Sequence, residues 1–166
     1  MLTGGHANPF GPDHRLVDVR LDEATLVRRR PEVEHEQSVA LFDLMEDNRF
    51  RLKGAKGPYV LVLSLEDDRL VLDVRSEDDR PLHRFLMSIK PFRRIVKDYF
   101  MVCESYYGAI TSGASPSRIE SIDMGRRGLH NEGAELLSQR LAGKIMIDHD
   151  TARRLFTLIC VLHIKG

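Results

Sequence analysis

Residues 123–137, "DMGRRGLHNEGAELL", hold the side chains of this chain that are best suited to binding an anion. Arg126 and Arg127 carry guanidinium groups, which hold carboxylates and phosphates through paired N–H donors. His130 follows shortly after, and an imidazole gains or loses its proton near neutral pH. These residue types at this spacing indicate either electrostatic recognition of an anion or acid–base chemistry.

The same segment holds residues that turn a chain between two helices. Gly125 and Gly128 can adopt backbone conformations closed to other residues, and Asn131 can cap a following helix with its side-chain oxygen. We therefore expect a helix corner over residues 123–132. The N-terminus of the second helix would add unpaired N–H groups and a partial positive charge beside the arginines, which together could cradle a phosphate or a carboxylate.

An architectural role is the competing interpretation of this corner. Glu132 would lie in the first turn of the second helix, where its negative charge could interact favourably with the helix dipole. Asp123 could form an ion pair with an arginine. The segment also lacks the Gly-Lys-Ser/Thr ending of a Walker A loop, and it follows a predicted helix rather than a strand. On the sequence alone the architectural interpretation is somewhat ahead of the binding one.

A second group of basic residues opens the helix predicted over residues 91–110. Lys90, Arg93, Arg94 and Lys97 share one face at helical spacing and form a positive stripe. Such a stripe is ordinarily a solvated face, but it would extend an anion site if the fold placed it beside the first group. The candidate ligand-binding residues are therefore Gly125, Arg126, Arg127, Gly128, His130, Asn131, Arg93, Arg94 and Lys97.

Two acidic groups were considered as metal sites. Glu34, His35 and Glu36 are consecutive, and consecutive residues of a helix diverge by about a third of a turn, so they cannot converge on one ion. Asp148 or Asp150 is explained more simply as the N-cap of the last helix. We expect no metal and no cofactor.

The two cysteines, Cys103 and Cys160, lie far apart within apolar helical segments. His163 lies three residues after Cys160, so the two could act as a catalytic thiol and its base. A buried cysteine is the better interpretation, because a nucleophilic thiol needs an electropositive, partly open setting. The absence of paired cysteines and of a secretory apolar segment at the N-terminus favours a reduced cytoplasm.

The elements that position these residues follow from the apolar pattern of the 166 residues, 42% of which are hydrophobic. We expect residues 1–13 to be a flexible leader and residues 14–166 to form a single α+β domain, with a small antiparallel sheet of about four strands packed against about five helices. Strands are predicted over 15–21, 59–65, 69–75 and 82–89, with a further short one over 144–148. Helices are predicted over 31–48, 91–110, 116–124, 132–142 and 151–164, so that the C-terminal half is mainly helical.

Composition narrows the classes of partner. Lys plus Arg and Asp plus Glu both number 25, so no global positive field recruits nucleic acid or an anionic membrane. Nucleic acid is therefore a disfavoured partner. The most apolar run, residues 155–164, is too short to cross a bilayer, which takes about 20 apolar residues, and we interpret it as a buried helix.

Long stretches resemble one known family. They are "VEHEQSVALFDLMEDN", "GPYVLVLSLEDDRLVLDVR", "KPFRRIVKDYFMVCESYYGAI", "IESIDMGRRGLHNEGAELL" and "DTARRLFTLICVLH". Together they look like a family of small uncharacterised proteins from alphaproteobacteria to which no activity is assigned. The resemblance runs from about Leu16 to the C-terminus, and it implies no mechanism.

The leading hypothesis is a non-enzymatic cytoplasmic binding or regulatory protein. It would recognise a small anion or an acidic segment of a partner through the corner at 123–132, where Arg126 and Arg127 supply charge while helix N–H groups and His130 complete the contacts. The absence of a complete catalytic constellation favours binding over catalysis.

Two alternatives stay open. The first is an enzyme acting on a phosphorylated or carboxylated small molecule, with His130 as general acid or base, Glu132 or Asp123 orienting it, and the arginines stabilising charge. The second is an RNA-binding protein that uses the basic stripe at 90–97. The sequence determines neither the ligand nor the oligomeric state.

Overall fold

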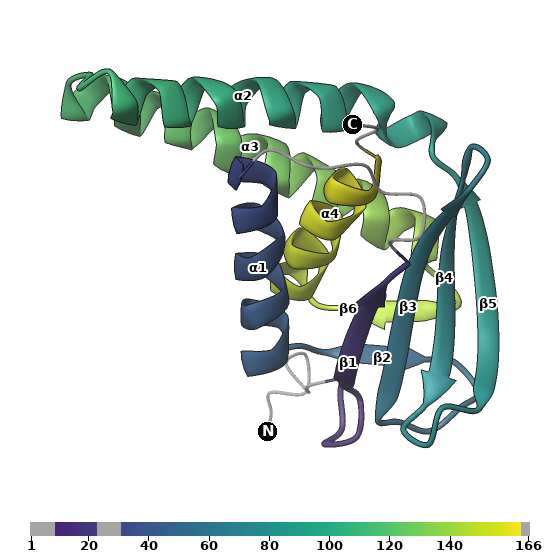
Figure 1. Cartoon of the computed structure of the whole chain (residues 1–166). Coiled ribbons are helices and arrows are strands. Elements are labelled where there is room, and N and C mark those ends of the chain that lie inside the picture. The colour runs from purple at the N-terminus through teal and green to yellow at the C-terminus, as the bar shows by residue number, and fades with distance from the viewer. Residues whose placement is uncertain (1–8, 23–30, 164–166) are drawn as a thin grey trace, which may run out of the picture.

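The computed structural model describes residues 9–22 and 31–163 (Figure 1). Most of the predicted leader, residues 1–13, lies outside the described residues, so its flexibility stays a prediction. The assignment of residues 14–166 to one domain likewise stays a prediction. The α+β class is confirmed, since the described chain contains helices and two sheets.

The larger sheet is mixed rather than antiparallel. Its strands lie in the order β1 (Leu16–Leu21), β3 (Tyr59–Glu66), β4 (Arg69–Ser76) and β5 (Pro81–Ser88). Strands β3, β4 and β5 form the antiparallel hairpins that the short acidic turns predict. Strand β1 instead pairs parallel to β3, with Leu16 opposite Tyr59. The prediction of a purely antiparallel sheet was wrong, because helix α1 and strand β2 separate β1 from β3 in the chain and supply the long crossover that a parallel pair needs.

A second, two-stranded sheet joins distant parts of the chain. Strand β2 (Phe50–Leu52) pairs antiparallel with β6 (Ile145–Ile147), and Phe50 lies opposite Ile147. The strand predicted over 144–148 is therefore confirmed, whereas β2 was not predicted. Three residues are too few to show alternation in the sequence, and the β2 partner strand lies far along the chain.

Four α-helices occur in the described ranges. They are α1 (Pro31–Glu46), α2 (Arg93–Thr111), α3 (Pro116–Leu141) and α4 (His149–His163), with a 3-10 turn (Lys90–Phe92) before α2. The predicted caps are confirmed. The Ser115 side chain accepts a hydrogen bond from the Arg118 N–H, and the Asp148 side chain accepts one from the Thr151 N–H.

The corner predicted over residues 123–132 does not exist, because α3 continues through it without a break. Gly125 and Gly128 are helical, and neither is among the glycines with positive φ. Two interior glycines cost a helix roughly 1 kcal/mol each relative to alanine. Packing against α2 on one side and α4 on the other offsets that cost, so the sequence signal for a break was overridden by tertiary contacts. The predicted two helices are one, which reduces the expected five helices to four.

The core lies between the sheet and the helices. Figure 1 shows α4 between α1 and the sheet, and α2 and α3 running side by side across the end of the molecule. Helix α4 is buried from Leu155 to Leu162, as predicted for its apolar run. The largest fully buried side chains come from both halves of the chain and include Tyr59, Tyr99, Phe50, Phe92, Phe156 and Leu44.

One glycine sets how closely α3 and α4 approach. A Cβ built on Gly133 would lie 2.6 Å from Cγ of Phe156 and closer still to its Cδ1 and Cε1 atoms. Phe156 is fully buried, so its ring has no free space into which to move. This crossing of α3 over α4 places His130, one helical turn earlier, against α4.

Candidate functional site

Arg126 faces the interior of the helical layer instead of solvent. Its Nη2 atom donates to Oδ1 of Asp123 at 2.7 Å, and its Nη1 atom donates to Oε1 of Glu36 at 3.3 Å. The guanidinium carbon also lies 4.3 Å from the centroid of the Tyr106 ring, a cation–π contact. With a side-chain exposure of only 21%, Arg126 is committed to these internal partners, and it is not available as the anion-binding group that we predicted.

Glu36 is the centre of a partly buried polar cluster that ties α1 to α2 and α3. Its Oε1 atom accepts hydrogen bonds from Arg126 and from the Tyr107 hydroxyl at 3.1 Å, and the Cys103 thiol lies at 3.8 Å. The neighbouring Glu34 and His35 are exposed, so these three consecutive residues diverge as expected.

The thiols of both cysteines are buried and free. Burial, and then the charge of Glu36, raises the pKa of Cys103 to about 12, so that this thiol is protonated at neutral pH. Burial likewise raises the pKa of Cys160. Both cysteines are free and buried, which agrees with the core interpretation, and the His163 side chain lies outside the described residues.

Arg127 is the exposed arginine of the pair. Its side chain is 69% exposed, and its Nη2 atom lies 3.0 Å from Oδ2 of Asp123, the carboxylate that also holds Arg126. Asp123 therefore pairs with both guanidinium groups, and Glu36 pairs with Arg126 as well. The helix N–H groups expected beside Arg127 are used within α3, because no helix begins there.

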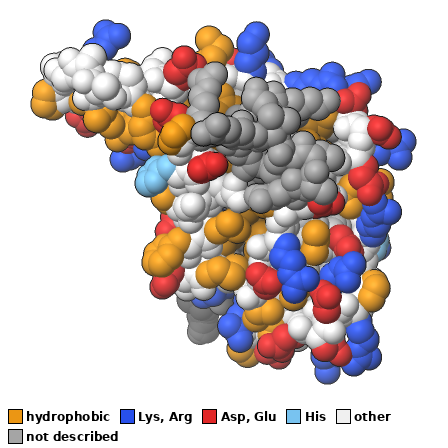
Figure 2. All heavy atoms as spheres, viewed as in Figure 1, with side chains coloured by type: hydrophobic (Ala, Val, Ile, Leu, Met, Phe, Trp, Pro, Cys, Tyr) orange, Lys and Arg blue, Asp and Glu red, His pale blue; other side chains and the backbone are white. Residues whose placement is uncertain are grey.

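The basic stripe at the start of α2 is largely paired with carboxylates. Arg93 bonds to Asp68 at 3.0 Å, while Arg94 bonds to Asp98 at 3.1 Å and also to Glu132 of α3. The two predicted basic regions are therefore adjacent, but an acidic residue joins them. Lys97 is exposed. Figure 2 shows the same intermixing of Lys or Arg with Asp or Glu over the strands on the face that it displays.

His130 points from α3 toward α4. Its Nε2 atom lies 3.1 Å from the Thr157 hydroxyl oxygen, and its ring centroid lies 4.8 Å from that of Tyr99. The Thr157 hydroxyl donates to the carbonyl of Arg153 at 3.2 Å, so its oxygen is free to accept the Nε2–H of His130. Burial, followed by the positive charges of Arg153 and Arg126, lowers the pKa of His130 to about 4. The imidazole is therefore neutral at pH 7.

His130 and Thr157 line a pocket of about 180 Å³ between α1, α3 and α4. A water molecule occupies about 30 Å³ in the liquid, so the pocket has room for about six waters or one small organic molecule. Helices α1 and α4 supply the remaining walls, which are formed by Val39, Ala40, Asp43, Asp150, Arg153 and Arg154.

Two charged groups in this pocket have unused hydrogen-bonding capacity. The Nε atom of Arg153 is buried without a partner, and its Nη1 atom is a distant 3.9 Å from Asp150. On the α1 wall, no group in the described part of the chain pairs with the Asp43 carboxylate. Arg154 is already engaged, because its Nη1 atom donates to the backbone carbonyl of Asp47 at 2.9 Å.

Sequence reasoning singled out only two of the pocket residues, His130 and, as a possible helix cap, Asp150. Arg153, Thr157 and Asp43 are ordinary members of two helical patterns, and only the packing of α1 against α4 brings them together. The signal that could have found them is the position of Thr157, a polar residue inside the most apolar run of the chain. Asn131, expected to cap a helix, instead lies within α3, with its Oδ1 atom 3.1 Å from Nε2 of His149.

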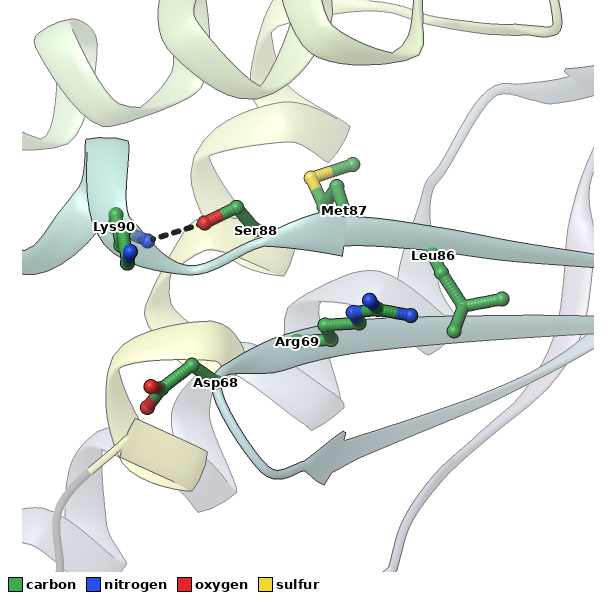
Figure 3. Close-up of a pocket in the computed structure, with 6 residues that line it drawn as sticks. All are labelled: Asp68, Arg69, Leu86, Met87, Ser88 and Lys90. Atoms are coloured by element: carbon green, nitrogen blue, oxygen red, sulfur yellow. Dashed lines mark hydrogen bonds between the residues drawn. The ribbon is translucent and has the colours of Figure 1, made fainter.

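A second hollow, of about 390 Å³, lies beside the end of the β4–β5 hairpin. Figure 3 shows its side chains spread along the strands and not directed at a common point. The hydrogen bond drawn there joins the Lys90 N–H to the Ser88 hydroxyl, and Asp68 is the ion-pair partner of Arg93. This hollow therefore lacks the converging polar groups of the His130 pocket.

Comparisons with known proteins place this chain in one family. Residues 13–165 match the model of an uncharacterised protein family, UPF0262. A UPF0262 protein of Rhodospirillum rubrum is 64% identical over 154 residues, covering 93% of this chain and 94% of its own. Relatives from Methylobacterium radiotolerans and Rhizobium etli are 56% and 59% identical, and the matches cover 94% and 93% of this chain and 96% and 98% of theirs.

These relatives carry no stated activity, and no solved structure matches the chain. In the part that the structure describes, no helix is both long and apolar enough to cross a membrane. The expected resemblance to an uncharacterised alphaproteobacterial family is confirmed: the chain belongs to the uncharacterised protein family UPF0262.

Proposed function

We propose that this protein is a non-enzymatic binding or regulatory protein that holds a small acidic group in the pocket at His130. The observation that carries the proposal is the buried Nε atom of Arg153, which has no partner. A buried donor left unsatisfied costs about 1–3 kcal/mol, and more when it is charged. A carboxylate or phosphate oxygen in the pocket would stabilise the charge of this guanidinium group, whose Nη1 atom is a distant 3.9 Å from Asp150, so the weakly paired arginine favours an acidic ligand.

The surroundings of Arg153 support this choice of ligand. The hydroxyl oxygen of Thr157 is fixed by its hydrogen bonds to His130 and to the Arg153 carbonyl, so the pocket wall is rigid and polar. Partial burial also strengthens a charge-assisted hydrogen bond, because the effective dielectric constant is lower than in water. The proposal retains the class of ligand predicted from the sequence and moves its site to the inward face of α3.

Binding is preferred over catalysis for a specific reason. The carboxylates expected to orient His130 are engaged elsewhere: Asp123 with Arg126 and Arg127, and Glu132 with Arg94. A general base works best when its pKa lies near the working pH, whereas burial holds the pKa of His130 at about 4. The imidazole is better suited to holding Thr157 in place than to transferring protons.

Thermal unfolding with added ligands tests the proposal. Acetate, inorganic phosphate and a short acidic peptide are added at constant ionic strength to the wild-type protein, to Arg153→Gln and to Arg140→Gln. Arg140 is a matched control because it is an exposed arginine of α3, about 15 Å along the helix from His130. The peptide distinguishes an acidic partner segment from a free small anion.

The expected result is stabilisation of the wild type and of Arg140→Gln, but not of Arg153→Gln. A ligand at a hundred times its Kd adds about 2.7 kcal/mol, or roughly 5–10 °C for a chain of this size. An equal shift in Arg153→Gln would exclude this pocket. The absence of any shift with all acidic ligands would overturn the proposed function.

A further inference from the structure

We infer that the ligand of the His130 pocket is a small zwitterion with the chemistry of an α-amino acid, which carries an ammonium group beside its carboxylate. This inference rests on the proposed function and specifies the substrate class of the same site. It follows from the Asp43 carboxylate, which faces the same pocket from α1 and pairs with no described group.

The charge of the pocket favours a zwitterion over a simple anion. Its ionised side chains are two aspartates and two arginines, and His130 is neutral at pH 7 because burial lowers its pKa. The pocket therefore has no net positive charge with which to attract an anion. A ligand with one charge of each sign matches such a pocket, whereas an anion alone would bind more weakly because the unpaired carboxylate of Asp43 opposes it.

The two unused groups stand on opposite walls. Arg153 belongs to α4 and Asp43 to α1, and they form no ion pair with each other. The Arg153 guanidinium group can donate to a ligand carboxylate while Asp43 accepts from a ligand ammonium group. The other two charged residues are less suited to these roles, since Arg154 is bonded to a backbone carbonyl and Asp150 is 63% exposed.

The rest of the pocket limits the size and polarity of the ligand. Val39 and Ala40 contribute an apolar part of the α1 wall, against which an aliphatic side chain can pack. A volume of about 180 Å³ admits a small or medium amino acid. The geometry thus points to an aliphatic amino acid.

Matched ligand pairs test the requirement for the ammonium group. Glycine, L-alanine and L-leucine are titrated separately into the protein, and so are acetate, propionate and 4-methylpentanoate, the same carboxylates without the amine. Binding is followed by two-dimensional NMR of the backbone amides, which detects weak complexes, with the Val39 and Thr157 amides as reporters from α1 and α4. The titrations are repeated with Asp43→Asn, Arg153→Gln and Glu46→Gln.

Glu46→Gln is the control for Asp43→Asn, because it removes the same charge from the same helix at an exposed residue that does not line the pocket. The expected result is that at least one amino acid binds about tenfold or more tightly than its matched acid. Asp43→Asn should abolish that difference, Glu46→Gln should preserve it, and Arg153→Gln should abolish binding of both members of the pair.

The two proposals fail in different ways. If the acids bind as tightly as the amino acids and both depend on Arg153, the zwitterion inference is wrong and the proposed function stands. If neither series perturbs the reporter amides up to the solubility of the ligands, both are wrong. A preference for amino acids that survives in Asp43→Asn would also overturn the inference, because another group would then hold the amine.

Discussion

Gly128 and Gly133 allow a direct test of the crossing between α3 and α4, because the same substitution in one helix should have opposite effects. A Cβ added at Gly128 meets no atom within 4 Å, whereas one added at Gly133 would overlap the buried Phe156 ring. Both residues are helical, so the intrinsic gain from alanine is the same at each. The difference between the two variants therefore measures tertiary packing alone.

The expected magnitudes follow from these two contributions. Gly128→Ala should raise the free energy of unfolding by about 1 kcal/mol, the difference in helix propensity. At Gly133 the same gain is opposed by overpacking, which costs about 3 kcal/mol at the upper end of its usual range when the neighbour cannot move away. Gly133→Ala should therefore lose about 2 kcal/mol net.

Thermal and urea unfolding provide the assay. With about 2–4 °C of Tm per kcal/mol for a chain of this length, Gly128→Ala should melt roughly 2–4 °C higher and Gly133→Ala roughly 4–8 °C lower than the wild type. Gly125→Ala is a second control, since its Cβ would make an ordinary 3.7 Å contact with Val102. A Gly133→Ala protein as stable as Gly128→Ala would refute the close approach of α3 to Phe156, and with it the placement of His130 against α4.

Three further predictions concern single side chains. Burial lowers the pKa of His130 from 6.5 to about 4, so the unfolded state takes up a proton first as the pH falls. The free energy of unfolding should therefore drop between those two pH values by as much as about 3 kcal/mol. Urea unfolding at several pH values should show a shallower decline for His130→Gln than for the exposed control His35→Gln. Asn48 is 6% exposed, and its side chain joins β1 to α1 through hydrogen bonds to Leu16 N–H, Leu16 C=O and Leu44 C=O. Asn48→Ala should therefore lower the free energy of unfolding by about 2–4 kcal/mol in the same assay. A loss below 1 kcal/mol, on the order of one net hydrogen bond, would contradict that role. A native thiol assay should find Cys103 unreactive at pH 7, since burial and Glu36 raise its pKa to about 12, and rapid labelling of the folded protein would show that the thiol is accessible.

Local chemistry allowed much of the fold to be predicted. Strands β3 and β4 are rich in alternating or β-branched apolar residues, and a short acidic turn follows each of them. Their hairpins can therefore be predicted from the local sequence alone. The caps at Ser115 and Asp148 depend on residues within three positions of each other. The apolar run of α4 could only be buried, whatever covered it.

The errors all came from contacts between distant segments. The glycines at 123–132 predict a break between two helices, because glycine disfavours helix. In the structure α2 and α4 pack along α3, and α3 is continuous through these residues. The parallel pairing of β1 with β3 likewise depends on how the intervening α1 packs against α4 and β1. A propensity of about 1 kcal/mol per residue is smaller than the energy of burying several large side chains, so tertiary packing decides.

The sequence by itself singled out one key residue of the candidate site, His130, and led us to expect an acidic ligand. Only the tertiary structure decided which other side chains line the candidate pocket. Arg126 and Arg127 are adjacent in sequence and both pair with Asp123, and Arg126 also pairs with Glu36. Arg153 and Asp43, by contrast, line one pocket from helices that are far apart in the chain. The physical reason is that a helix places consecutive residues on different faces, so a binding site is assembled from the faces that packing brings together and not from neighbours in the sequence.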